Sequence, residues 1–508
     1  MINSFFFRSN LIGAGSLQTL RASKCGLSIS LLSPAILDVI DSLMKAGYDA
    51  YIVGGGVRDL MLGENPKDFD AVTNATPAQI KQVFGRRCRI IGRRFELAHV
   101  HSGREMIEVA TFRAPPKKAV TSAAGMILRD NNWGTIEQDF VRRDFSINTM
   151  YYQPRKGEIL DFCNAYQDVK NKKLRLLGDA QQRFEEDPVR MLRTLRFAAK
   201  LNFDIDQSIL DVFKPELTTL LRDVSPHRLY DESQKMFSVG KLTELLPMLI
   251  DFNIWHQMLA DVAPEVTPFI LRAAKNTDHR INQGKSINSA FFYAVLLWQP
   301  YLKRLESYIA KGMAPAEARS QASIEVLKRQ ATRTIIPRYA EMFIREVWEM
   351  QGRLISPKAQ HIAALAGHVR FRAAFDFLLL RELSGDDSTQ GMGQWWENYQ
   401  ELGNDAKEKA IADFNRKQSR SRKKKNDEVL EDPLAPLVLE TQVNTRAARR
   451  AKQKIARQEE QSFKPNGRTS DKHIDRAEKE GGVHSDHPIL KRRRVQRDLK
   501  QVVFGPTQ

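Results

Sequence analysis

Two acidic side chains one residue apart, Asp68 and Asp70, follow an apolar stretch and a run of glycines. Successive side chains of a β-strand point to opposite faces, so these two carboxylates would project to the same side. Carboxylates held a few ångströms apart repel each other, and a divalent cation relieves that repulsion. The spacing therefore predicts a metal site with Asp68 and Asp70 as ligands.

The glycine run upstream of these acids is Gly54-Gly55-Gly56, with Arg58 two residues further on. Glycines without a Cβ expose backbone N–H groups, which can cradle phosphate oxygens. Taken alone, a glycine run is usually a turn, and an Asp-x-Asp pair is usually an exposed strand or loop. At this short spacing behind an apolar strand, the two together predict metal-assisted nucleotidyl transfer.

A third carboxylate is expected from the alternating segment 106–112, which reads as a strand with Glu108 on one face. If this strand lies beside the Asp-x-Asp strand, Glu108 enters the metal site. The following segment, 114–124, has paired prolines and no periodicity, so it is expected to be a mobile surface loop beside the site.

A second cluster of charged residues lies at 187–196, where Asp187 and a proline suit the start of a helix. Arg190, Arg193 and Arg196 are three residues apart and would line one helical face. Three arginines on a buried helix repel unless an anion or acceptor lies between them. A triphosphate and a base edge would supply this, and Asp with Arg could select a base without a template. The alternative is an interdomain salt-bridge network with the glutamates at 185–186.

Bulk composition favours a soluble protein with a polyanionic partner. The 508 residues have a formal charge of +18 and a pI near 9.7, which points to nucleic acid, although a basic tail could merely aid solubility. No window approaches the roughly 20 apolar residues of a membrane span. Cys25, Cys88 and Cys163 match no zinc spacing and read as reduced thiols of a cytosolic protein.

The order of elements predicts an α+β head followed by helices. Residues 1–35 read as a disordered N-terminal arm, with an organellar presequence as the alternative. Strands are expected near 51–53, 69–72, 88–91 and 97–101, and helices at 34–47, 57–62 and from Thr76 and Pro77 to Phe84. Another charged helical segment opens 136–152. Residues 183–400 are helical in pattern, and the buried contexts of Trp298, Trp348, Trp395 and Trp396 suggest core.

The segment 404–508 differs in character from the rest of the chain. It holds 26 Lys and Arg residues against 16 Asp and Glu, and it has few aromatic residues. Such a composition is typical of a disordered or partly helical basic tail that binds RNA.

Four motifs in this order resemble those of class II nucleotidyltransferases, the superfamily of bacterial poly(A) polymerases and tRNA CCA-adding enzymes. They are Val53-Gly-Gly-Gly-Val-Arg-Asp59, Lys67-Asp-Phe-Asp70, Arg142-Arg-Asp-Phe-Ser-Ile-Asn148 and Glu186-Asp-Pro-Val-Arg-Met-Leu-Arg193. Further segments resemble the bacterial poly(A) polymerase form: 91–100, 107–113, Lys275-Asn-Thr-Asp-His-Arg280, Asn288-Ser-Ala-Phe-Phe292 and Phe371-Arg-Ala-Ala-Phe-Asp376. The resemblance covers roughly residues 36–403.

The resemblance implies a small mixed-sheet nucleotidyltransferase head at 36–180, an all-helical neck and body at 181–403 that binds nucleotide and RNA, and the basic tail at 404–508. It implies Asp68 and Asp70 as metal ligands. The third catalytic carboxylate is either Glu108, which strand geometry favours, or Asp144, which lies in the Arg-Arg-Asp motif; a structural role for Asp144, in capping or in pairing with Arg142, is the alternative. The implied nucleotide-binding residues are Gly54, Gly55, Gly56, Arg58, Arg143, Asp187, Arg190, Arg193 and Arg196.

The implied activity is template-independent polyadenylation of RNA 3′ ends, with ATP as substrate, two Mg²⁺ ions (or Mn²⁺) and release of pyrophosphate. RNA 3′ ends are the expected partner, together with RNA-degradation or RNA-chaperone proteins, in the cytoplasm and away from membranes. A tRNA CCA-adding enzyme is the alternative within the superfamily, and a non-catalytic RNA-binding protein is the alternative of another class. A small-molecule nucleotidyltransferase would not need the basic tail.

Overall fold

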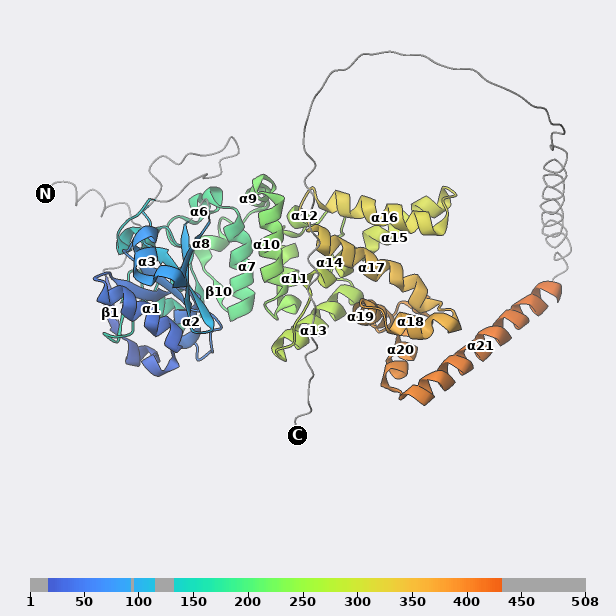
Figure 1. The fold of residues 1–508 in the computed structure, drawn as a ribbon. Coiled ribbons are helices and arrows are strands. Elements are labelled where there is room, and N and C mark those ends of the chain that lie inside the picture. The colour runs from blue at the N-terminus through green and yellow to red at the C-terminus, as the bar shows by residue number, and fades with distance from the viewer. Residues whose placement is uncertain (1–16, 93–95, 115–131, 432–508) are drawn as a thin grey trace, which may run out of the picture. The chain divides into compact units, whose positions relative to one another are not determined.

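An eight-stranded mixed sheet forms the first part of the chain in the computed structural model, which describes residues 17–92, 96–114 and 132–431 (Figure 1). The strand order is β1-β8-β7-β2-β3-β6-β5-β4. The strands are β1 (Gln18–Arg21), β2 (Ala50–Val53), β3 (Asp70–Thr73), β4 (Cys88–Ile91), β5 (Leu97–Ser102), β6 (Glu105–Thr111), β7 (Tyr151–Gln153) and β8 (Glu158–Asp161).

Only one pair of neighbours in this sheet is parallel. Strands β3 and β6 run in the same direction, with Asp70 opposite Glu108, while all other neighbouring strands are antiparallel. A parallel pair needs a crossover connection, and here the chain passes through a helix and strands β4 and β5 between them. The mixed sheet of the predicted α+β head is confirmed.

Two helices pack against this sheet and show the expected start signals. Helix α1 (Pro34–Lys45) contacts strands β2, β3, β5 and β6, and helix α3 (Pro77–Phe84) contacts β4 and β5. Thr76 caps α3 through a capping box with Gln79, and Pro77 occupies the first turn, as the sequence predicts. Ile36, Val39 and Ile40 of α1 are fully buried, so the apolar stripe lies in the core.

The prediction that residues 1–35 form a disordered arm is wrong for the part that the structure describes. Strand β1 pairs with β8 at the edge of the sheet, with Gln18 opposite Asp161. The short 3₁₀ turn Ala22–Cys25 follows, and Ala22, Cys25 and Leu27 are buried. Pairing with a ready edge strand orders a segment whose own sequence has little strand pattern. Residues 1–16 lie outside the described residues.

The head predicted to end at 180 is not separated from the helices after it. A two-stranded parallel sheet joins β9 (Lys173–Leu174) to β10 (Asp204–Ile205) across that boundary. Helix α7 (Val189–Leu201) contacts both strands. The chain as far as 418 clusters as one compact unit, and a single hydrophobic core cluster includes residues from both sides of 180.

Between residues 180 and 431 the chain is mainly helical, as predicted, although strand β10 falls within the part expected to be all-helical. Trp298, Trp348 and Trp396 are buried in its cores, and Trp395 is half-buried. The helices are α6 (Ala180–Glu186), α8 (Gln207–Leu210), α9 (Pro215–Thr218), α10 (Pro226–Phe237), α11 (Leu242–Asp251), α12 (Trp255–Met258), α13 (Pro268–Asn282), α14 (Ser289–Leu296), α15 (Trp298–Ala310), α16 (Pro315–Gln330), α17 (Arg338–Ile355), α18 (Ile362–Ala366), α19 (Phe371–Glu382) and α20 (Met392–Glu401).

The described start of the basic tail is a helix, α21 (Asn404–Glu431). Its residues Ala410, Ile411 and Phe414 pack against a second hydrophobic cluster built from helices α17 to α20. The boundary predicted at 403 therefore falls before residues that still belong to a packed core. The remainder of the tail, 432–508, and most of the loop predicted at 114–124 lie outside the described residues.

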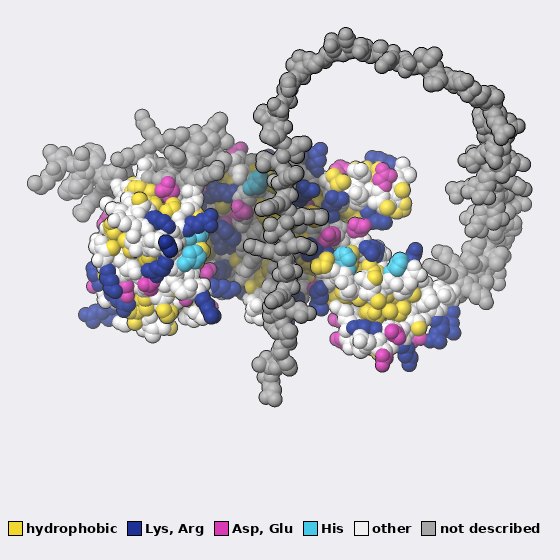
Figure 2. Space-filling model, in the orientation of Figure 1, with side chains coloured by type: hydrophobic (Ala, Val, Ile, Leu, Met, Phe, Trp, Pro, Cys, Tyr) yellow, Lys and Arg dark blue, Asp and Glu magenta, His cyan; other side chains and the backbone are white. Residues whose placement is uncertain are grey.

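Basic side chains recur over the visible surface of the described residues, with acidic side chains between them (Figure 2). Among the described helices, none has the length and apolar character needed to cross a membrane. All three cysteines are free thiols and buried.

Candidate active site

The three consecutive glycines after β2 lie at the start of α2 (Gly55–Met61). At two of these positions, Gly54 and Gly56, the backbone conformation or the surrounding atoms disfavour a larger residue. Gly54 has φ +83°, a backbone conformation that side chains with a Cβ rarely adopt. A Cβ on Gly54 would lie 3.6 Å from Oδ2 of Asp70, and a Cβ on Gly56 only 2.9 Å from the Phe69 ring. The turn is thereby pressed against the segment that carries the two acids.

The predicted neighbourhood of Asp70 and Glu108 is confirmed by the strand register. Glu108 on β6 is the direct partner of Asp70 on β3. Asp68 lies two residues before, in the segment leading into β3, and it is exposed, as is Asp70. Phe69 between them is buried, so the alternation places both acids on the open side of the chain.

The surroundings of Asp70 disfavour its charged form. Desolvation by the surrounding protein, with Glu108 and Asp68 as like charges, raises the pKa of Asp70 to about 6, and Arg143 opposes the rise. Three carboxylates therefore lie near one another at the start of β3, and Arg143 only partly offsets their effect on the pKa of Asp70. This is the electrostatic setting that a bound divalent ion would relieve.

His99, which is not among the predicted site residues, lies in a row with Asp70 and Glu108, on the next strand, β5. It is the register partner of Glu108 on β5, and its Nε2 lies 3.5 Å from Oε1 of Glu108. The signal that could have found it is the pairing of the adjacent strands 97–101 and 106–112, which a short turn connects. Asp70, Glu108 and His99 thus form one line across three strands.

Arg143 is held beside this row by a buried carboxylate. Asp139, which has no exposed surface, accepts hydrogen bonds from Arg142 and Arg143 and from the Tyr151 hydroxyl, at 2.6 to 3.1 Å. Burial alone would raise the pKa of Asp139, but the two guanidinium groups hold it at about 2. Asp139 is a second residue that sequence reasoning missed, because a lone Asp in a charged helix carries no signal.

Arg58 does not face solvent. Its side chain is 2% exposed, and it donates hydrogen bonds to Oδ1 of Asp59 and to Oδ1 of Asn148. Its guanidinium also lies 5.4 Å from the Phe197 ring centre. The predicted direct grip of Arg58 on phosphates has no support in this geometry, and its contacts instead fix α2 against the 146–148 turn and α7.

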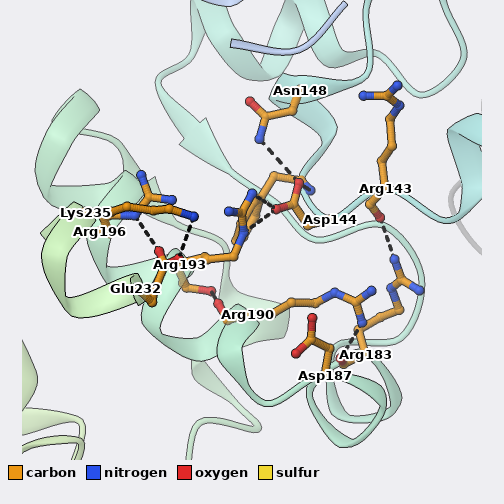
Figure 3. A network of polar contacts seen from close by, with 12 residues as sticks. Arg143, Asp144, Asn148, Arg183, Asp187, Arg190, Arg193, Arg196, Glu232 and Lys235 are labelled. Carbon is orange, nitrogen blue, oxygen red and sulfur yellow. Dashed lines mark hydrogen bonds and ion pairs between the residues drawn. The ribbon is translucent and has the colours of Figure 1, made fainter. Parts of the chain in front are cut away.

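Asp144 is engaged by helix α7, not by the acidic row. Its Oδ2 accepts two hydrogen bonds from Arg193, at 2.8 and 2.5 Å, and its Oδ1 accepts from the Phe145 N–H and from Asn148 (Figure 3). Burial alone would raise the pKa of Asp144, but Arg193 and these hydrogen bonds lower it. Of the two candidates for the third carboxylate, Glu108 is therefore the one beside Asp70.

Each arginine on the predicted face of α7 has a partner within the protein. Arg190 donates to the Arg183 carbonyl and pairs with Glu186, and Arg196 bonds Glu232 of α10 at 2.6 Å (Figure 3). The guanidinium groups of Arg193 and Arg196 also lie over the Phe197 ring. The salt-bridge alternative accounts for these contacts, although its acids are Glu186, Asp144 and Glu232 and not Glu185.

Helix α7 begins one residue later than the sequence suggests, because Pro188 occupies the N-cap position expected for Asp187. Pro188 precedes the first helical residue, Val189, whose N–H donates to Oδ1 of Asp187 at 3.3 Å. The other oxygen, Oδ2, accepts from Arg228 at 2.7 Å. Asp187 therefore lies just before α7, which carries the three arginines, and Arg193 connects that helix to Asp144.

Asp68, Asp70 and Glu108 have the type of side chain that binds a divalent cation, but they are not arranged as a ready metal site. Within residues 17–92, 96–114 and 132–431, no group of three or more His, Cys, Asp or Glu side chains is arranged as a metal site. Yet Asp68 and Asp70 are exposed carboxylates, the type of ligand that Mg²⁺ prefers, and desolvation together with the charges of Glu108 and Asp68 raises the pKa of Asp70. These two residues would hold the ion, and Glu108 would border it.

Three family models match the chain. A poly A polymerase head domain matches residues 50–175, a probable RNA and SrmB-binding site of polymerase A matches 202–270, and a polymerase A arginine-rich C-terminus matches 311–428. They follow one another in the order of the sheet, the first helices after it and the helices that end with α21.

Among curated proteins, Poly(A) polymerase I of Salmonella typhimurium is 39% identical over 386 residues, which are 73% of this chain and 83% of that protein. Poly(A) polymerase I of Haemophilus influenzae is 37% identical over 80% of this chain and 93% of its own length. The CCA-adding enzyme of Lactobacillus helveticus is 34% identical, but over only 39% of this chain and 49% of its own length.

Among solved structures, a CCA-adding enzyme in an apo form covers 75% of this chain and 86% of its own, with a TM-score of 0.53 and 21% identity. That likeness shows a shared fold. The motifs at the glycine turn and the acids, the three family models and the extent of the two polymerase relatives agree. The chain belongs to the bacterial poly(A) polymerase family of nucleotidyltransferases.

Proposed function

We propose that this enzyme transfers AMP from ATP to the 3′-hydroxyl of RNA without a template and releases pyrophosphate. The observation that carries the proposal is the line of carboxylates in which Asp70 and Glu108 are direct strand partners and Asp68 lies two residues away. Family membership supplies the substrate class, because the relatives that match most of their own length are named Poly(A) polymerase I.

In this proposal Asp68 and Asp70 hold two Mg²⁺ ions, for which Mn²⁺ is a substitute. Bound there, the ions would lower the pKa of the RNA 3′-hydroxyl and neutralise the departing pyrophosphate. The chain itself orients the reactants. Gly54 to Gly56 present backbone N–H groups to the phosphates, and Arg143, which Asp139 holds in place, lies near enough to Asp70 to lower its pKa.

Helix α7 is proposed to hold the base and sugar of ATP. Asp187, Arg190, Arg193 and Arg196 would exchange some of their present contacts for those of the nucleotide. Arg58 and Asp144 are proposed as positioning residues, because their polar atoms are engaged within the protein. RNA would bind through its backbone to basic side chains of the body and tail, so its affinity should fall steeply with salt.

The segment that matches a probable RNA and SrmB-binding site, 202–270, is proposed to bind RNA and a protein partner that acts on RNA. A cytoplasmic location is proposed with it. Both follow from the family and the RNA substrate.

A primer-extension assay tests the activity. The purified enzyme is given ATP, CTP, GTP or UTP one at a time, with oligo(A) and with a tRNA that lacks its terminal CCA. We expect repeated addition from ATP to oligo(A) and no dependence on CTP. Addition limited to the tRNA, and requiring CTP, would identify a CCA-adding enzyme, the activity named for relatives that match part of the chain. Binding without any incorporation would favour a non-catalytic RNA-binding protein.

A further inference from the structure

A cavity of about 340 Å³ lies in the helical part of the chain, between α13, the start of α14 and the start of α19. Three segments that the sequence singled out and the active site does not use meet here: Lys275–Arg280, Asn288–Phe292 and Phe371–Asp376. They come from distant stretches of sequence, and the RNA-binding model at 202–270 contains none of them. We call this cavity the body pocket.

Aromatic rings form one part of the pocket's lining. Phe291 and Phe343 both line the cavity. Phe343 is buried and Phe291 is half-buried. The guanidinium of Arg370 lies 5.4 Å from the centre of the Phe343 ring and is held by Glu346 at 2.6 Å. Flat apolar faces and a fixed guanidinium plane are the surfaces on which unpaired nucleobases stack.

Basic groups form the rim. Arg280 is half-buried, and its described hydrogen bond, to the Ser286 carbonyl, is long at 3.3 Å. The Arg372 side chain is 68% exposed and pairs with Asp376, whose pKa burial raises although Arg372 and Arg280 oppose the rise. Arg280, Arg370 and Arg372 thus line the cavity with Asp376, and Glu346 pairs with Arg370, so three positive charges meet two negative ones. The excess positive charge suits a phosphate.

The volume and the polar groups of the pocket limit the kinds of ligand that it can bind. Pockets that enclose small organic ligands begin at about 300 Å³, so this volume holds one nucleotide unit and not a folded helix of RNA. Asn276 and Asn288 add amide groups to the lining, and amides can hydrogen-bond the edge of a base. Rings, guanidinium groups and amides together match one unstacked nucleotide.

We propose that the body pocket binds one nucleotide of the single-stranded RNA substrate, with the base against Phe291 and Phe343 and the phosphate at Arg280 and Arg372. This rests on the proposed function in taking RNA as the substrate. The pocket would add affinity and register for the RNA upstream of the reacting end, and would take no part in the chemical step.

Two variants of the full chain test this by different means. Arg280→Ala with Arg372→Ala removes the phosphate contacts. Ala373→Met fills the cavity from the first turns of α19 and leaves every charge in place, because Ala373 lines the pocket and methionine favours helices. The control is Arg353→Ala, which removes one exposed positive charge on α17 outside the pocket. The thermal unfolding temperature of each variant is measured to check that the fold is kept.

The measurements are the dissociation constant for a short fluorescein-labelled oligo(A), its salt dependence, and kcat and KM for RNA in AMP incorporation. Each pocket variant should bind the oligo(A) roughly tenfold more weakly, and the arginine variant should also lower the salt slope by about 0.7 per lost phosphate contact. The KM for RNA should rise with kcat unchanged at saturating RNA, while Arg353→Ala stays within about twofold.

Unchanged RNA binding in Ala373→Met, or equal weakening in Arg353→Ala, would overturn the proposal, since only general charge would then matter. Free AMP and ATP are tested as competitors of the labelled RNA. If the pocket variants lose binding of free nucleotide but keep full RNA affinity, the pocket belongs to a free nucleotide and the proposal fails. If the variants lose RNA affinity while even the wild-type chain incorporates no AMP, the pocket stands and the proposed activity falls.

Discussion

Asp70 is the residue on which the proposed chemistry depends most. It has carboxylate neighbours in Glu108 and Asp68, and Arg143 only partly offsets their charge. A carboxylate whose pKa is raised by its surroundings is costly for a protein to keep, and such groups cluster at functional sites, which is consistent with the proposed metal site. The adjoining residues differ, because Arg58 and Asp144 have protein partners for their polar atoms.

Replacing Asp70 with Asn should stop catalysis without weakening RNA binding. The amide keeps the shape of the side chain but loses the charge needed for a metal ion, whose charge stabilisation is worth several kcal/mol. AMP incorporation into oligo(A) should therefore fall by roughly a thousandfold or more. Asp204→Asn, which alters an exposed aspartate on β10, is the control. Substantial residual activity in Asp70→Asn would remove the proposed metal site.

Asp139 should control stability in acid. Its pKa is about 2 in the folded chain and 3.8 as a reference, so its ion pairs contribute fully above about pH 4 and are lost as pH falls towards 2. The shift corresponds to about 2 kcal/mol, and Asp139→Asn should cost roughly 3 kcal/mol at neutral pH because two partly buried guanidinium groups lose their fully buried partner.

Urea unfolding at a series of pH values measures this effect. The wild-type curve should fall more steeply than that of Asp139→Asn on the acid side, so the two should converge as the carboxylate of the wild type is protonated. Parallel curves would show that the stability of the site does not depend on the charge of Asp139.

At this scale the sequence predicts the residue types and their order but not their partners. Asp68, Asp70 and the glycines are found by short spacing, because strand alternation and turn sterics are local. The partners of Arg58 are not predicted, since its burial against Asn148 and Phe197 depends on residues about 90 and 140 positions away. Asp139 is missed although Arg142 and Arg143 lie only three and four residues further on, because the spacing alone does not show that the carboxylate is buried. His99 is missed because the register of β5 against β6 is needed to place it opposite Glu108.

At the scale of the element, helix α7 connects two parts of the site. Arg193 holds Asp144, and Arg196 holds Glu232 on α10, so a shift of this helix would be felt by the 144–148 turn and by the next helices. Proposed nucleotide binding requires Arg193 to exchange Asp144 for the ligand or to contact both. Kinetics can separate these two arrangements.

Arg193→Ala and Asp144→Ala form a matched pair for that purpose. If Arg193 contacts ATP, its removal should raise the KM for ATP roughly tenfold, whereas Asp144→Ala leaves Arg193 free and should raise it less. The double variant should then resemble Arg193→Ala. Equal increases in KM in both single variants would instead make the ion pair a structural link only, and α7 would lose its proposed contact with the nucleotide.

Elements with strong local signals are predicted well, and those ordered by neighbours are not. The capped helix α3 and the alternating strands β4, β5 and β6 match the sequence pattern closely. Strands β7 and β8 are missed: β7 has only three residues, and it follows a segment whose charged pattern favours a helix. Strand β1 is missed because it exists through its pairing with β8.

At the scale of the whole molecule, charge in the tail and packing in the tail can be separated. Truncation after Glu431 keeps α21, whose Phe414 packs on the second hydrophobic cluster, and removes 17 Lys and Arg residues with 10 Asp and Glu. We expect this variant to keep its unfolding temperature and to bind RNA more weakly, most clearly at low salt, because electrostatic contacts are screened at high salt.

Truncation after Gly403 is the informative comparison, since it also removes the contacts of Ala410, Ile411 and Phe414. It should lower the unfolding temperature as well as RNA affinity. RNA affinity that is the same with and without residues 432–508 at every salt concentration would show that the tail does not contribute to RNA binding.

The short parallel pair between β9 and β10 has a consequence for how the protein is made. Lys173 and Leu174 find their neighbours at Asp204 and Ile205, so the catalytic half cannot be completed until about thirty further residues have left the ribosome. A fragment that ends at residue 180 would expose strand β9 without its partner β10 and would be prone to aggregate. Calorimetry on residues 1–418 should accordingly record one melting peak, and the enzyme would be active as a whole or not at all.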